Sequence, residues 1–202
     1  MVLIALEGVD GCGKSTVINH LRSRFGDDVV WTREPLVRRD DLERMTPRSR
    51  LSYFLHDHQA HLEKVIQPAL DAGKHVISDR YLSSHIAYQS HDLYFQDLAF
   101  YAFGHFANEP SIDKYLGEMQ KMYENDRHAD FEIYLDLPPA MASARCANKG
   151  ERLMEKKAYE LMWLYGQIFS KKSEGVVKTI NASRAVPIVA NDIEAVIKEC
   201  VS

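Results

Sequence analysis

The stretch that decides the fold is residues 2–16, Val-Leu-Ile-Ala-Leu-Glu-Gly-Val-Asp-Gly-Cys-Gly-Lys-Ser-Thr. Its apolar start predicts a buried strand over residues 2–6, which runs into a loop with the spacing G-x-x-x-x-G-K-[ST]. Gly8, Gly11 and Gly13 let the backbone curl closely around an anion, because no Cβ stands in the way. Backbone N–H groups and the N-terminus of the following helix then face that anion. The stretch therefore predicts a nucleoside triphosphate site.

Two polar residues of this loop have separate expected tasks. The Lys14 ammonium should reach the β- and γ-phosphates, and the Ser15 hydroxyl should ligate Mg²⁺. The alternative is a glycine-rich turn with a solvated lysine. The strand before the loop and the helix after it argue against that alternative.

Bulk composition limits the class of protein. A chain of 202 residues with 46% hydrophobic and 27% charged residues suits a single globular domain over 1–202. Its net charge of −4 argues against a nucleic-acid partner. No apolar run reaches the ~18 residues of a membrane span, and the N-terminus lacks the pattern of a signal peptide. The three widely spaced cysteines suggest neither a disulfide framework nor a zinc site. We expect a cytoplasmic protein with no membrane partner.

Strands alternate with helices along the rest of the chain. Further strands are expected at 29–32, 75–78, 133–137 and 179–180, with helices between them. This alternation predicts an α/β fold with a central parallel sheet of about five strands and helices on both faces. Ligands should bind beyond the carboxyl ends of the strands.

Two helices carry recognisable start signals. Thr46-Pro47 should cap a long helix that Gly73 ends and that Pro68 bends. The final helix should begin with the capping box formed by Asn191 and Glu194.

Charged residues follow two of the expected strands directly. Asp79-Arg80-Tyr81 leaves the third strand, and Arg33-Glu34-Pro35 leaves the second. Because the carboxyl ends of parallel strands meet at one edge of a sheet, both groups should lie beside the phosphate-binding loop.

Together with the loop, these groups resemble the thymidylate kinase family of P-loop nucleoside monophosphate kinases. The string Asp79–Gln89 is the most specific part, and Tyr81 stands where deoxynucleoside kinases typically carry serine. The resemblance implies a P-loop kinase fold with a lid segment at about 145–155. It covers residues 5–16, 32–35, 69–89, 134–145 and 179–183.

The resemblance implies transfer of the γ-phosphoryl group of ATP to dTMP, giving dTDP, with Mg²⁺ bound. Lys14 would stabilise the transferring phosphoryl group, and Ser15 and Asp79 would hold the metal. Arg80 would bridge the donor and acceptor phosphates. The residues expected to contact ATP are Gly8, Asp10, Gly11, Cys12, Gly13, Lys14, Ser15 and Thr16.

The acceptor site is also implied by the resemblance. Arg33 would steady the acceptor phosphate, Phe54 would stack on the base, and Asp10 and Tyr88 would lie at the sugar. Plain packing in the core is the alternative for Phe54 and Tyr88. The expected acceptor-binding residues are Asp10, Arg33, Phe54, His58, Arg80, Ser84, His85 and Tyr88.

Two histidines depart from the family pattern near the base. His58 stands where the family usually has an arginine that contacts thymine, and His85 stands where it has Asn or Thr. A neutral imidazole donates one hydrogen bond, whereas a guanidinium donates several. Both histidines could still serve thymine, or they could shift the preference to another deoxynucleoside monophosphate.

The lid should supply a catalytic arginine. Some family members carry an arginine inside the phosphate-binding loop, where this chain has Gly11. Others place basic residues in the lid, and Arg152 fits that role better than Lys149 or Arg145. Two other functional classes remain open, a non-catalytic nucleotide-binding protein and a hydrolase that needs no acceptor. The family resemblance also predicts a homodimer.

Overall fold

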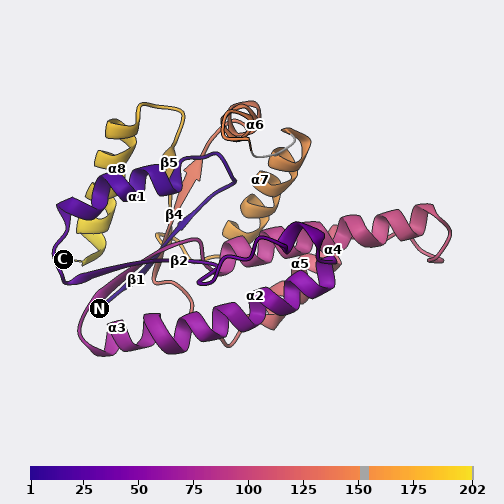
Figure 1. Ribbon diagram of the computed structural model, residues 1–202, viewed down its shortest axis with the longest axis horizontal. Helices are drawn as coiled ribbons and strands as arrows, with labels where there is room; N and C mark the ends of the chain where they lie inside the picture. The colour runs from indigo at the N-terminus through magenta and orange to yellow at the C-terminus, as the bar shows by residue number, and fades with distance from the viewer. Residues whose placement is uncertain (151–154, 202) are drawn as a thin grey trace.

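The computed structural model describes residues 1–150 and 155–201. Within those ranges five strands form one sheet in the order β2-β3-β1-β4-β5 (Figure 1). Every neighbouring pair is parallel, so the predicted α/β fold with a parallel sheet is confirmed. The strands are β1 (Leu3–Glu7), β2 (Val29–Arg33), β3 (His75–Asp79), β4 (Phe131–Asp136) and β5 (Val177–Asn181).

The helices cover both faces of this sheet. Right-handed crossovers send the β1–β2 connection to one face and the next three connections to the other. Helices α1 (Lys14–Leu21) and α8 (Val186–Val201) therefore pack together on one side (Figure 1). The opposite side carries the helices that lie between β2 and β5. These are α2 (Pro47–His61), α3 (Gln67–Asp71), α4 (Leu82–Ala102), α5 (Ile112–Met122), α6 (Pro139–Ala147) and α7 (Glu155–Phe169).

The long helix after β2 starts as predicted but is irregular at a different place. The Thr46 hydroxyl accepts a hydrogen bond from the Ser49 N–H at 3.2 Å, and Pro47 opens the helix. The departure from α geometry is a π-helical turn over Leu62–Ile66. It lies upstream of Pro68 because a proline ring clashes with the carbonyl four residues earlier and offers no N–H to it.

The predicted start of the last helix is wrong. Helix α8 begins at Val186, and Asn191 and Glu194 lie inside it. Their side chains accept hydrogen bonds from Arg24 Nη1 at 2.7 and 2.6 Å. The polar pair therefore ties α8 to the segment that follows α1, and the capping pattern was a coincidence of local spacing.

The core and the site share the central strand. All five residues of β1 are buried, and β1 pairs with β3 on one side and β4 on the other. The carboxyl end of β1 thus opens into the phosphate-binding loop between two strand ends. In the part of the chain that the structure describes, no helix is both long and apolar enough to cross a membrane.

Candidate active site

The glycines of the phosphate-binding loop are required by its shape. Gly8, Gly11 and Gly13 have φ of 144°, 81° and 102°, values that L side chains rarely adopt. A Cβ at Gly11 would lie 2.4 Å from the carbonyl oxygen of Ala142, on α6. The loop is therefore packed against α6 so closely that no side chain fits at position 11.

Lys14 lies over the loop that precedes it. Its side chain is buried, and Nζ donates hydrogen bonds to the carbonyl oxygens of Gly8 at 2.8 Å and Val9 at 3.1 Å. The Cys12 sulfur lies 3.4 Å from the same nitrogen. The ammonium charge is thereby fixed at the centre of the loop.

Two oxygen groups from different strands meet beside Lys14. The Ser15 hydroxyl, in the first turn of α1, donates to Asp79 Oδ2 at 2.9 Å. The parallel pairing of β1 with β3 brings them together, because Leu6 and Asp79 are partners in that ladder. Carboxylate and hydroxyl oxygens are donors that suit Mg²⁺.

Arg80 reaches from the end of β3 across the loop. Its φ of 74° is a strained value for a residue other than glycine, and its N–H donates to the Leu6 carbonyl at 2.9 Å. The guanidinium donates to the Gly8 carbonyl at 3.1 Å and to Asp10 Oδ1 at 2.5 Å. It also lies over the Tyr88 ring, 4.9 Å from the centroid. These contacts aim Arg80 at the space next to the loop.

Asp10 is held in its ionised form by this arrangement. Burial alone would raise the pKa of Asp10, but Arg80 and Lys14 together lower it below its ordinary value. The Tyr88 hydroxyl donates to Asp10 Oδ2 at 3.0 Å and accepts the Asp10 N–H at 3.0 Å. Asp10, Arg80 and Tyr88 therefore form one hydrogen-bonded group.

A cleft of about 860 Å³ joins these residues to α2 and α4. Most of the residues that the sequence analysis named lie along it. They are Asp10, Gly11, Gly13, Lys14, Ser15, Thr16, Arg33, Phe54, Asp79, Arg80, Ser84, His85 and Tyr88.

The cleft has further lining residues that the sequence analysis did not assign. Arg38 and Arg50 add positive charge, and Arg50 pairs with Asp92 at 2.8 Å. Gln89 and Glu34 also line the cleft. Arg38 and Arg50 belong to a stretch that the family resemblance does not cover. Glu34 and Gln89 stand inside the motifs that match the family, so their positions in the sequence could have indicated that they line the site.

His58 does not line the cleft, which corrects its expected contact with the base. Its side chain is 2% exposed and packs behind Glu34, with Nδ1 2.9 Å from Glu34 Oε1. The His58 ring also packs against the rings of Tyr81 and Tyr123. Of the two unusual histidines, His85 is the one at the cleft, edge-on to the Phe54 ring at 5.6 Å.

Comparison with known proteins identifies the family. Residues 6–97 match a family model described as thymidylate kinase. The chain is 31% identical over 206 residues to a probable thymidylate kinase of Halobacterium salinarum, with 98% of this chain and 96% of the relative covered. The chain belongs to the thymidylate kinase family.

Other members support this assignment. A thymidylate kinase of Francisella philomiragia is 28% identical over 219 residues, covering 96% of both chains. A probable thymidylate kinase of Methanoculleus marisnigri is 49% identical over 96 residues, a match that covers 44% of this chain and 47% of the relative. Thymidylate kinases are phosphotransferases, and this chain is one of them.

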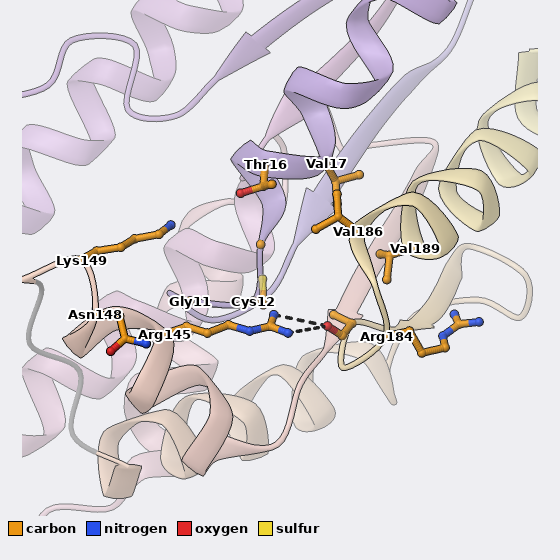
Figure 2. A pocket seen from close by; sticks show the side chains of 12 residues that line it. Gly11, Cys12, Thr16, Val17, Arg145, Asn148, Lys149, Arg184, Val186 and Val189 are labelled. Carbon is orange, nitrogen blue, oxygen red and sulfur yellow. Dashed lines mark hydrogen bonds between the residues drawn. The ribbon is translucent and has the colours of Figure 1, made fainter.

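A second pocket, of about 360 Å³, lies on the other side of the loop (Figure 2). Val17, Val186 and Val189 give it an apolar wall between α1 and α8. The Arg145 guanidinium crosses its floor and donates to the Ala182 carbonyl at 3.3 Å from both terminal nitrogens. Because the pocket adjoins Gly11 and Thr16 of the phosphate-binding loop, it could hold a flat ring attached to a bound phosphate group.

The expected lid is described in part. Arg145 lies on α6, and Lys149 lines both the pocket and the cleft. Arg152, the expected catalytic residue of the lid, lies outside the described residues.

Proposed function

We propose that this protein transfers the γ-phosphoryl group of ATP to the 5′-phosphate of dTMP, giving ADP and dTDP. The observation that carries the proposal is the position of Arg80. Its guanidinium contacts both the Gly8 carbonyl of the phosphate-binding loop and Asp10 at the cleft. One cation therefore adjoins the places where the donor and acceptor phosphates would lie.

The charges of the cleft suit a reaction between two polyanions. An oxygen of the acceptor phosphate attacks the γ-phosphorus, and ADP leaves with the electrons of the broken P–O bond. The acceptor phosphate is already ionised near neutral pH, so no strong general base is needed. Positioning and charge neutralisation carry the catalysis. Lys14, Arg33 and Arg80 supply positive charge on this surface.

The acceptor nucleoside would occupy the cleft away from the loop. Phe54 offers a ring for the base; His85 lies edge-on to that ring, and Gln89 lines the same cleft. Asp10 and Tyr88 offer oxygen atoms to the sugar. Ser84 lies next to Arg80, whose guanidinium donates to its hydroxyl at 3.1 Å.

The donor nucleotide would bind across the loop. We assign its base to the pocket of Arg145, Val17 and Val189 (Figure 2), and its phosphates to the loop N–H groups and Lys14. Ser15 and Asp79 would hold Mg²⁺, which when bound neutralises phosphate charge. Arg152 would add its charge on lid closure. A cytoplasmic location, where both nucleotides are available, belongs to the same proposal, and the homodimer stays a prediction.

Product analysis tests this proposal. The protein is incubated with Mg-ATP and dTMP, and nucleotides are separated by ion-exchange chromatography. We expect dTDP and ADP in equal amounts, and neither product from Lys14→Ala. ADP without dTDP would replace the proposal with a hydrolase, and no turnover would replace it with a binding protein.

A further inference from the structure

Three imidazoles converge on one buried carboxylate at the wall of the cleft. Glu34 is 2% exposed and follows β2. Its Oε1 lies 2.9 Å from His58 Nδ1 and 2.8 Å from His61 Nδ1, and its Oε2 lies 2.8 Å from His85 Nε2. Burial opposes ionisation, yet His85, His58 and His61 together hold the pKa of Glu34 well below its ordinary value. A single negative charge is thus surrounded by nitrogen donors.

The outer nitrogen of each histidine also faces a polar group. His58 Nε2 lies 3.4 Å from Asp126 Oδ2, and His61 Nε2 lies 2.6 Å from the Thr32 hydroxyl. His85 Nδ1 lies 3.2 Å from the Tyr123 hydroxyl. Histidines that ligate metals have the outer ring nitrogen bonded to a carboxylate or another polar oxygen. His85 has such a bond to Tyr123, whereas His58 Nε2 faces Asp126 without an aligned hydrogen bond.

The hydrogen bonds within the cluster leave buried polar atoms without partners. Glu34 Oε2 has no aligned hydrogen bond despite its short contact with His85, and His58 Nε2 has none either. Such atoms are costly in a protein interior unless something satisfies them. Ligand atoms of Glu34, His58 and His85 all lie within 4.8 Å of one another. An ion placed among them would satisfy the carboxylate oxygen.

We propose that Glu34, His58 and His85 form a binding site for a divalent transition-metal ion of the Zn²⁺ type. A histidine ligates a metal through the lone pair of a neutral ring, so the facing nitrogens of His58 and His85 would bind the ion with the remaining ring proton on the outer nitrogen, next to Asp126 and Tyr123. His61 is a positioning residue that holds Glu34 through Oε1.

The donor set separates this site from the Mg²⁺ position. Two imidazole nitrogens and one carboxylate oxygen suit Zn²⁺, Co²⁺ or Ni²⁺, whereas Mg²⁺ prefers oxygen ligands such as those of Ser15 and Asp79. Glu34 and His85 line the cleft, so an ion can enter from there, while His58 closes the site from behind. The bound ion would lie in the cleft wall next to Phe54.

Metal titration of the full chain tests the proposal without an activity assay. The chelator-treated protein is titrated with Zn²⁺ by calorimetry and with Co²⁺ by visible absorption. We expect one equivalent of Zn²⁺ with a Kd below about 10 μM, visible Co²⁺ bands, and no displacement by excess Mg²⁺.

Variants assign the ligands. His85→Asn should weaken Zn²⁺ binding at least 100-fold, and Asp126→Asn should weaken it about tenfold through His58. His91→Gln is the matched control, because His91 is a buried histidine paired with Glu160 outside the cluster, and it should bind like the unchanged chain. Thermal unfolding of each variant checks folding. Equal Zn²⁺ affinity in His85→Asn, or no Zn²⁺ binding by the unchanged chain, would overturn the proposal.

Discussion

The guanidinium of Arg80 is bound to the carboxylate of Asp10 at 2.5 Å, which joins the end of β3 to the middle of the phosphate-binding loop. The end of β3 and the loop after β1 lie side by side because β1 and β3 are neighbouring strands. Because the Tyr88 ring lies under the same guanidinium, Arg80 is fixed from two sides. A phosphate group that replaced Asp10 as its partner would find the cation already positioned.

Arg80→Lys should lower kcat/KM for the acceptor by roughly 10²–10³-fold. Lysine keeps the charge but loses the planar fork that contacts Gly8, Ser84 and Asp10 together. Steady-state kinetics measure the loss, and thermal unfolding checks the fold. Arg39→Lys, at an exposed pair with Asp41, is the control and should be neutral. A loss in Arg80→Lys below about threefold would remove Arg80 from the proposed role.

Gly11→Ala should abolish ATP binding and lower the free energy of unfolding by about 1–3 kcal/mol. The added Cβ would meet the Ala142 carbonyl oxygen at 2.4 Å, and the φ of 81° is unfavourable for alanine. Urea unfolding and ATP titration measure the two effects.

Gly117→Ala is the matched control for this substitution. Gly117 lies in α5, and a Cβ there meets nothing within 4 Å. Alanine should therefore stabilise the protein by about 0.5–1 kcal/mol. Equal effects of the two substitutions would contradict the close packing of the loop on α6.

Glu7 should make the protein less stable as pH rises from about 4.5 to about 8. Burial first, and the neighbouring charge of Glu132 second, raise the pKa of Glu7 from 4.5 to about 8 in the folded state. The folded protein therefore holds this proton more tightly than the unfolded chain. The contribution is complete below the unfolded pKa and is lost as pH passes through the folded one.

Urea unfolding at pH 5.5 and pH 8.5 measures this effect. Glu7→Gln has no titrating group, so its unfolding free energy should fall less between the two pH values, by an amount on the order of a few kcal/mol. The pKa values of Glu34 and Asp10 are lowered in the folded protein, so their titration changes the unfolding free energy at acidic pH, below this window. Parallel pH profiles for the unchanged protein and Glu7→Gln would contradict this prediction, because they would show that Glu7 is ionised at both pH values.

The parts of the molecule set by local rules were predictable from the sequence. The strand, loop and helix over residues 2–16 follow from an apolar run and from glycines at required positions. The start of α8 was not predictable in the same way. Asn191 and Glu194 make a valid capping pattern, but the bonding partner they use is Arg24, far away in the chain.

His58 shows the corresponding limit for the site. The expected contact of His58 with the base was implied by the family resemblance, which has an arginine four residues after the stacking phenylalanine, and this spacing places Phe54 and His58 on one face of α2. How deeply the His58 side chain is buried depends on how α2 packs against distant parts of the chain. The rings of Tyr81 and Tyr123 and the carboxylate of Glu34 enclose His58, and none of these lies on α2.

Arg152→Ala should lower kcat by about 10³-fold or more while leaving the fold intact. The expectation rests on the proposed role of the lid: the phosphate-binding loop has Gly11 where some family members carry an arginine, and Arg152 would supply that charge instead. Single-turnover kinetics at saturating nucleotides measure the chemical step. Lys156→Ala, at an exposed lysine of α7, should leave kcat unchanged. If Lys149→Ala shows the large loss and Arg152→Ala does not, the assignment within the lid is wrong.

Acceptor choice tests the central claim most directly. ADP production from Mg-ATP is measured with dTMP, dUMP, dCMP, dGMP, dAMP and no acceptor, at equal concentrations. The proposed function predicts turnover that depends on an acceptor and is fastest with dTMP. Equal ADP production with and without acceptor, or a clear preference for another monophosphate, would contradict it.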